Sequence, residues 1–536
     1  MAEGSGPRLR RDAGIVGLLF ASLGGIIGSG WLLGPLAAAK IAGPSAILAW
    51  MIGGIAVLLL SFVYAELATA FPRAGAVIAL PKLSHGSLLA VILSFVVFLG
   101  YASVPPAESS AVITYATNYI PGLVTKAGVL TVEGYFASAI LLVIFAFINT
   151  LAIKLVLAIN SGLTWWKLVI PILTILVFVF VGFHAGNFSS HGFAPAGVSG
   201  VFSATATSGI VFSYLGFRQA VELAGESSNP KRNLPIAIIG SVVIGLIIYC
   251  GLQVAMIGAL HPSDLANGWS KVTFAGAFGP FAGLASLIGM GWLAVLLYID
   301  AFISPSGTGI IYFTTTARVL FATGKEGLIG GKTFARLSVA GVPIVGVIVT
   351  FFVGLLFLMP FPSWQGIVTF ISSATVLSYG TGPVVLLTLR KTMPVERYKR
   401  PYLLAGGMII SYIAFIISNF IIFWSGAATD NFLFGLILVF SIIYIGYETI
   451  AGVGLTNLHW RGAWWLAPYF FGMWLITYLG PKALTGGTGT LDQIAASIIL
   501  IVFSIVILLL AMNSGIPDPE EAKASILAGE PELEGR

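Results

Sequence analysis

Long apolar runs separated by short polar segments repeat along almost the whole chain. A helix that crosses a bilayer needs about 20 apolar residues, with a usual range of ~17 to 25. Fourteen stretches meet this requirement, so the pattern predicts an all-α polytopic membrane protein of about fourteen spanning helices, with twelve as the alternative. The stretches are 14–36, 45–70, 88–118, 134–153, 161–184, 200–224, 234–260, 281–322, 342–361, 364–389, 402–424, 432–453, 464–481 and 492–512.

The composition agrees with a bilayer environment. Of the 536 residues, 58% are hydrophobic and only 9% are charged, whereas an ordinary soluble domain has about 25% charged residues. Because a chain of this length exposes a large surface, so little charge excludes a soluble protein. The single cysteine, Cys250, excludes an intramolecular disulfide and a cysteine-based metal cluster.

The distribution of lysine and arginine orients the spans, because cytoplasmic loops are rich in both residues. With the N-terminus inside, the inside segments hold 20 of these residues and the outside segments hold 4. The remaining two, Lys167 and Arg218, fall within spans. We therefore expect a multi-pass protein of the cell membrane with both termini in the cytoplasm. This topology also explains the excess positive charge, so no nucleic-acid partner is expected.

The first span carries glycine and serine at its middle, in the sequence GGIIGSGW from Gly24 to Trp31. Glycine costs about 1 kcal/mol in a helix interior relative to alanine, so this cluster weakens the helix at mid-membrane depth. Unwound backbone is tolerated there only where it is buried in protein or lines a cavity. Its freed N–H groups would bind a carboxylate and its freed carbonyls an ammonium. The alternative is that the small residues only allow close helix packing.

The sixth span contains a second segment of this kind. A pair of glycines, Gly209 and Gly216, brackets aromatic residues in the sequence GIVFSYLGF. The first and sixth spans occupy corresponding positions in two halves of five helices each. That placement is the expected signature of a transporter built from an inverted repeat, with its substrate site at the two broken helices.

Several motifs within about residues 10–400 resemble, in order and spacing, those of the amino acid–polyamine–organocation superfamily. They are the Gly-Ser-Gly of the first span, YAEL from Tyr64, FPRAG from Phe71, FSYLGF from Phe212, ESSNPKRNLP from Glu226, SPSGTG from Ser304 and ARVL from Ala317.

The resemblance implies a secondary amino acid transporter with a leucine-transporter-like core of ten helices, here residues 14–390. Residues 402–512 then form additional transmembrane helices, and the flanking segments 1–13 and 513–536 are cytoplasmic tails, the second of them acidic.

The two broken helices supply the expected substrate site. The substrate's α-carboxylate would meet the N–H groups around Ser29, its amine would meet carbonyls of the first and sixth spans, and Phe212 would act as a lid. The predicted substrate-binding residues are Ile26, Ile27, Gly28, Ser29, Gly30, Val211, Phe212, Tyr214, Gly216 and Arg218.

Ionisable residues at membrane depth are expensive and mark functional sites. Lys167 resembles the lysine that proton-coupled family members place where sodium-driven relatives bind a cation, so protonation would stand in for sodium binding. The alternative is a lysine that snorkels to the interface. Glu108 in the third span, Asp300 in the eighth and the hydroxyl of Ser304 complete the predicted coupling set. Since sodium-coupled relatives use similar hydroxyls, sodium coupling stays open.

Arg218 departs from the family pattern, which often has an acidic residue at this position. A guanidinium facing the site would favour anionic side chains through bidentate pairing. We therefore expect acidic amino acids, aspartate or glutamate, as substrates. The alternative is an internal ion pair with Glu222, four residues later on the same helix face.

Other functional classes lack their motifs. The sequence has no Gly-x-x-x-x-Gly-Lys-Ser/Thr loop for ATP, no histidine array typical of a metal site and no Gly-x-Ser-x-Gly element. We thus expect no enzyme activity, no cofactor and no metal. The favoured function is a proton-coupled symporter, as monomer or homodimer. An amino acid or amino acid/polyamine exchanger is the main alternative, and an ion channel the alternative of another class.

Overall fold

The computed structural model of the chain describes residues 13–73, 75–151, 153–338, 341–450 and 458–527. The basic cluster of the N-terminal tail (Arg8, Arg10 and Arg11) and the end of the acidic C-terminal tail lie outside these residues. Throughout the described residues the regular structure is helical, as predicted. The helices are α1 (Ile15–Ile26), α2 (Ser29–Ala42), α3 (Ala46–Ala70), α4 (Ala76–His85), α5 (Ser87–Ala102), α6 (Val104–Ala116), α7 (Val132–Thr150), α8 (Ile153–Val181), α9 (Gly197–Thr207), α10 (Ile210–Tyr214), α11 (Arg218–Glu222), α12 (Pro230–Ala259), α13 (Pro280–Leu287), α14 (Gly291–Lys325), α15 (Gly331–Phe334), α16 (Ile344–Phe357), α17 (Trp364–Thr392), α18 (Gly407–Ser425), α19 (Ala427–Ile450), α20 (Trp460–Ala463), α21 (Leu466–Leu479), α22 (Lys482–Thr485), α23 (Gln493–Ser514) and α24 (Glu520–Leu527).

Every predicted apolar stretch contains a helix, but the helices differ in length. Among the described residues, ten segments are long and apolar enough to cross a membrane, or eleven if the bent α9–α11 segment is one span. One of the ten is the continuous stretch Ser29–Ala70 of 42 residues, about twice the ~20 that one crossing needs. The total number of crossings and the inverted repeat remain predictions.

One predicted span contains a break that was not expected. The stretch 281–322 was expected to be a single long helix, but the chain breaks between α13 and α14. Gly289 lies at the break with a φ of 80°, a backbone conformation that glycine adopts without strain. The break went unpredicted because apolar residues continue on both sides of it.

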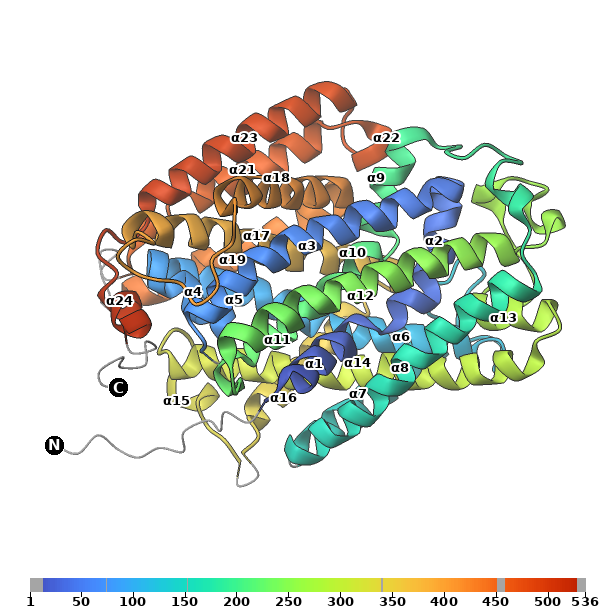
Figure 1. Cartoon of the computed structure of the whole chain (residues 1–536), viewed down its shortest axis with the longest axis horizontal. Coiled ribbons are helices and arrows are strands. Elements are labelled where there is room, and N and C mark those ends of the chain that lie inside the picture. The colour runs from blue at the N-terminus through green and yellow to red at the C-terminus, as the bar shows by residue number, and fades with distance from the viewer. Residues whose placement is uncertain (1–12, 74, 152, 339–340, 451–457, 528–536) are drawn as a thin grey trace, which may run out of the picture.

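The helices run side by side, mostly along the long axis of the molecule (Figure 1). The central helix is α17, whose most apolar segment is entirely buried inside the protein. Helix α19 faces outward, with only 22% of its most apolar segment buried. Segments predicted to lie in the cytoplasm, α4, α15 and α24, gather at one end of the bundle (Figure 1). Helix α22, in a segment predicted to lie outside, is at the opposite end, and so is α13, the start of the predicted span 281–322 (Figure 1).

A buried ionic contact joins α3 to the C-terminal end of α17, at the predicted cytoplasmic end of the bundle. Glu66, fully buried, accepts hydrogen bonds from both Nε (3.0 Å) and Nη2 of Arg390, and from the backbone N–H of Leu404 at 2.8 Å. Arg400 lies 3.9 Å from the same carboxylate. Glu66 therefore makes a contact between the ends of two helices.

We expect Glu66→Gln to destabilise the protein by about 3 to 5 kcal/mol, because it leaves buried arginine without its counter-charge. Thermal unfolding in detergent measures the loss. Glu326→Gln is the matched control, since Glu326 pairs with Lys82 at 2.6 Å while a third of its side chain is exposed, and exposed pairs contribute only ~0 to 1 kcal/mol. Equal shifts of the two melting temperatures would contradict the assignment.

Candidate functional site

The first span is interrupted at the predicted place. Helix α1 ends at Ile26 and α2 begins at Ser29, with Ile27 (φ −85°, ψ 89°) and Gly28 (φ −127°, ψ −139°) in non-helical conformations between them. These residues lie within the glycine-rich cluster, and both are buried. Backbone groups are therefore released from helical hydrogen bonding in the interior of the bundle.

The sixth span is interrupted as well. Helix α9 ends at Thr207, α10 begins at Ile210, and the two segments meet at a bend of 49°. Gly209 has a φ of 86°, which strains any residue with a side chain. A Cβ there would also lie 2.6 Å from the indole of Trp364, so both conformation and space call for glycine.

The two interrupted helices touch each other. A Cβ on Gly216 would lie 2.2 Å from the backbone of Gly25, and one on Gly30 would lie 2.0 Å from Oγ of Ser213. Close packing, the alternative considered for the glycines of the first span, is thus also realised. It brings the two helices together beside the breaks, while Gly28 and Gly209 occupy the breaks themselves.

The freed N–H groups meet a carboxylate of the protein itself. The backbone N–H of Ser29 donates to Oε2 of Glu108 at 2.9 Å, and Trp364 Nε1 donates to the Ser29 hydroxyl at 2.8 Å. The N–H of Gly28 is bonded to the carbonyl of Ile26 at 3.1 Å. The start of α2 therefore binds a carboxyl group of the protein, at the helix N-terminus where such a group is expected.

The freed carbonyls meet a cation. Lys167 Nζ donates to the carbonyl of Gly24 at 2.9 Å and to Oγ1 of Thr308 at 2.8 Å. The Thr308 hydroxyl lies 3.0 Å from the same carbonyl and 3.3 Å from that of Ile27. Lys167 is fully buried inside the protein, so its side chain does not snorkel to the interface. Its ammonium links the end of α1 to α14.

Glu108 and Thr308 lie on two sides of the first break. A Cβ on Gly28 would approach Glu108 Oε1 at 2.5 Å and Thr308 Oγ1 at 2.8 Å. Glu108 is fully buried, and among the described residues its Oε1 has no hydrogen-bond partner. Three of the polar residues selected from the sequence, Lys167, Glu108 and Ser29, are thus brought together around one interruption.

Asp300 lies on the same face of α14 as Thr308, two turns earlier. Its Oδ1 accepts hydrogen bonds from Trp166 Nε1 at 2.8 Å and from the Ser304 hydroxyl at 2.6 Å. No ion-pair contact within 4.0 Å joins it to Lys167, although both residues are described. The partners of Asp300 in the structure are therefore the neutral polar groups of Trp166 and Ser304.

Arg218 lies in a cage of aromatic rings beyond the second break. Its guanidinium carbon is 4.4 Å from the ring centre of Tyr379 and 5.0 Å from that of Tyr64. Its Nη1 donates to the hydroxyl of Ser378 at 2.9 Å. Among the described residues it makes no ion-pair contact with Glu222, and its Nε has no hydrogen-bond partner. Stacking on tyrosine faces is thus its main interaction.

The other predicted residues of the sixth span differ in where they point. Phe212 packs edge-on against Trp364, with ring centres 6.5 Å apart. Val211 is buried next to Gly53 of α3. The Tyr214 hydroxyl donates to the carbonyl of Trp50, which is also in α3. Phe212 thus lies near the breaks, whereas the side chains of Val211 and Tyr214 contact α3.

Two residues of the site were missed from the sequence. Trp364 donates a hydrogen bond to the Ser29 hydroxyl, and its indole ring packs against Gly209. The hydroxyl of Tyr249 donates to the carbonyl of Ile26 at 2.8 Å. Trp364 stands directly after Ser363, whose side chain caps α17. That cap marks a helix start, but no local signal indicates that the indole reaches α2.

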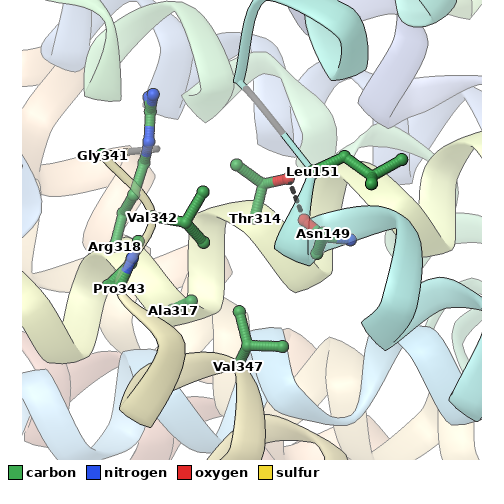
Figure 2. Close-up of a pocket in the computed structure, with 9 residues that line it drawn as sticks. All are labelled: Asn149, Leu151, Thr314, Ala317, Arg318, Gly341, Val342, Pro343 and Val347. Carbon is green, nitrogen blue, oxygen red and sulfur yellow. Dashed lines mark hydrogen bonds between the residues drawn. The ribbon is translucent and has the colours of Figure 1, made fainter. Parts of the chain in front are cut away.

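A cleft of about 310 Å³, partly open to solvent, lies elsewhere, between the end of α7, the later part of α14 and the start of α16 (Figure 2). Its polar lining includes Arg318 and the hydrogen-bonded pair Asn149 and Thr314. None of the predicted site residues lines it. The residues that line it are Asn149, Leu151, Thr314, Ala317, Arg318, Gly341, Val342, Pro343 and Val347.

Comparison with known proteins shows which family the chain belongs to. Residues 14–447 match the amino acid permease family. The chain belongs to this family. It is 36% identical over 539 residues to the glutamate/serine transporter AimA of Bacillus subtilis, covering 98% of each chain. It is 35% identical to the aspartate-proton symporter of the same organism, over 95% of this chain and 97% of the relative.

A more distant relative is the branched-chain amino acid permease BcaP of Bacillus subtilis, 25% identical over 82% of this chain and 93% of that one. These matches confirm the resemblance to the amino acid–polyamine–organocation superfamily. They also establish the permease as a multi-pass membrane protein whose relatives are transporters.

We expect Gly28→Ala to lower amino acid uptake at least about tenfold, equivalent to ~1.4 kcal/mol, because the methyl group displaces Glu108 or Thr308 from the break. The two atoms that the methyl group would meet, Glu108 Oε1 and Thr308 Oγ1, are at the ends of side chains that can move, so the variant should still fold. Uptake into proteoliposomes measures the effect. The control is Gly17→Ala on α1, where a Cβ meets nothing within 4 Å; similar uptake in the two variants would refute the site.

Proposed function

We propose that this permease is a proton-coupled symporter of acidic amino acids in the cell membrane, with both termini in the cytoplasm. One observation carries the proposal: the buried Lys167 ammonium bridges the Gly24 carbonyl, at the unwound end of α1, and Thr308 of α14. A titratable cation at the junction of two helices that must separate gives protonation a direct effect on conformation.

The substrate would bind at the first break. Its α-carboxylate would take the N–H of Ser29, displacing Glu108, and its amine would take carbonyls at the ends of α1 and α9. Phe212 and Trp364, packed against each other beside these groups, would cover it. The positive end of α2 favours the carboxylate, and the negative end of α1 favours the amine.

The proton would act through the hydrogen bonds of Lys167. A protonated lysine has three N–H donors and a charge, and it holds the Gly24 carbonyl and Thr308 together. A neutral amine loses the charge and one donor, so its hold on α1 weakens. Loss of the proton toward the cytoplasm would then release α1 and allow the site to open inward, which couples substrate movement to proton movement.

Two observations support an acidic substrate. The relatives at 36% and 35% identity are named for glutamate and serine and for aspartate with protons. In addition, Arg218 follows the second break, and its Nε has no hydrogen-bond partner in the described part of the chain. A side-chain carboxylate leaving the breaks toward the cytoplasm would meet this guanidinium and exchange tyrosine stacking for a charge-assisted hydrogen bond.

We expect Lys167→Ala to lose accumulation of labelled aspartate driven by an inward proton gradient, while counterflow against unlabelled aspartate persists. The variant lacks the titratable ammonium that holds the Gly24 carbonyl to Thr308, so a proton gradient can no longer act on this contact. Parallel assays in proteoliposomes separate the two activities. Accumulation equal to that of the unaltered protein would refute proton coupling through this residue. If the unaltered protein shows counterflow but no gradient-driven uptake, it is an exchanger.

We expect Arg218→Gln to reduce aspartate uptake at least about tenfold more than serine uptake, since only aspartate presents a second carboxylate to the guanidinium. Arg218→Lys, which keeps the charge but not the planar fork, should give an intermediate ratio. The ratio of the two initial rates is the measurement. An unchanged ratio in both variants would assign Arg218 to the tyrosine cage alone, and strong leucine uptake without aspartate uptake would end the acidic assignment.

A further inference from the structure

We propose that Asp300 is a second proton-binding site of the carrier, which takes the proton on the outer side and delivers it to Lys167. The inference rests on the proposed proton symport. It goes beyond that function because it assigns the entry of the proton, and a separate residue, to a defined place in the fold.

Asp300 is a fully buried carboxyl group with unequal oxygens. Oδ1 accepts two hydrogen bonds, from the indole of Trp166 and the hydroxyl of Ser304. Oδ2 has no partner among the described residues. A bare carboxylate oxygen in such surroundings is strongly disfavoured, whereas the neutral acid can hold its proton on Oδ2 without any change to the two bonds at Oδ1.

The position of Asp300 along α14 is on the outer side of Lys167. Helix α14 ends at Lys325, and the adjoining Glu326 pairs with Lys82, which the predicted topology places inside. Asp300 is nine residues from the opposite end of α14 and eight residues before Thr308, a separation of about 12 Å along the axis. A proton from outside would therefore reach Asp300 before Thr308 and Lys167.

The groups that face Asp300 leave Lys167 as its partner for proton transfer. Tyr115 of α6 lies within electrostatic range of Asp300, and so does Lys167 of α8. Helix α13 contributes no titratable residue. Trp166, which binds Asp300, is the residue next to Lys167, so the two proton sites share one short segment of α8.

The Lys167 side chain lies against a glycine of α14. Gly307 lies between the levels of Ser304 and Thr308, and a Cβ there would stand only 3.1 Å from Lys167 Cε. With glycine at this position, a neutral amine that has left Gly24 can swing along α14 toward Asp300. The acid gives the Oδ2 proton to the Lys167 amine, forming a carboxylate and an ammonium, and the ammonium returns to Gly24 and Thr308.

The test is Asp300→Asn, which keeps an oxygen for Trp166 and Ser304 but cannot carry the proton. In proteoliposomes with an acidic exterior, we expect accumulation of labelled aspartate to fall at least about tenfold, with counterflow preserved within about twofold. Counterflow serves as the measure of folding and substrate binding. The same accumulation as in the unaltered protein, together with the same dependence on external pH, would overturn the proposal.

A matched control is Asp430→Asn on α19. Asp430 is also fully buried, and its oxygens accept hydrogen bonds from Ser373 at 3.0 Å and Thr477 at 3.1 Å. Asp430 lies in the additional C-terminal helices, so proton-driven uptake by the Asp430→Asn variant should match that of the unaltered protein. An equal loss in both variants would overturn the proposal, because the effect would then follow from removing any buried carboxyl group.

Ser304→Ala provides a graded readout. Removing one of the two donors to Oδ1 destabilises the carboxylate, so the acid holds its proton to higher pH. The midpoint of uptake against external pH should move upward, and an unmoved midpoint would count against Asp300. If the unaltered protein shows no proton-driven uptake at all, the proposed symport fails instead, and that result is separate from any effect of the variants.

Discussion

The structure depends on one constraint: backbone N–H and C=O groups at membrane depth need partners, because lipid supplies none. Interrupting α1 at Ile27 and Gly28 releases several of these groups, and side chains from four other segments satisfy them. Glu108 comes from α6, Lys167 from α8, Tyr249 from α12 and Thr308 from α14. The positions of Glu108 and Lys167 follow from this requirement, since the carboxyl group meets a backbone N–H and the ammonium meets a backbone C=O.

The interruptions could be predicted because their cause is local. Glycine at the middle of an apolar run is unfavourable in a helix, and Gly28 and Gly209 mark both breaks. The importance of Lys167, Glu108 and Asp300 was also visible, because a charge within an apolar stretch stands out whatever its surroundings. Helix type and approximate position followed from the length of the apolar runs.

The partners could not be predicted, because they come from helices far apart in the chain. Nothing near Arg218 indicates that Tyr64 and Tyr379 enclose it, and the nearby Glu222 suggested an ion pair that the structure does not contain. Trp364 was missed for the same reason, since tryptophan in a membrane helix is ordinary until its neighbours are known. The split between α13 and α14 escaped prediction because hydrophobicity alone does not show where a helix bends.

At the proposed substrate site, the hydrogen bond between Ser29 and Glu108 would make Glu108 an internal competitor for the substrate carboxylate. Any ligand carboxylate that takes the Ser29 amide must first evict a group tethered to α6, so the measured dissociation constant combines intrinsic affinity with the fraction of molecules in which the amide is free. A carrier must release its cargo as readily as it captures it. Recapture of the amide by the tethered carboxylate would favour departure, so weak apparent binding would serve rapid turnover.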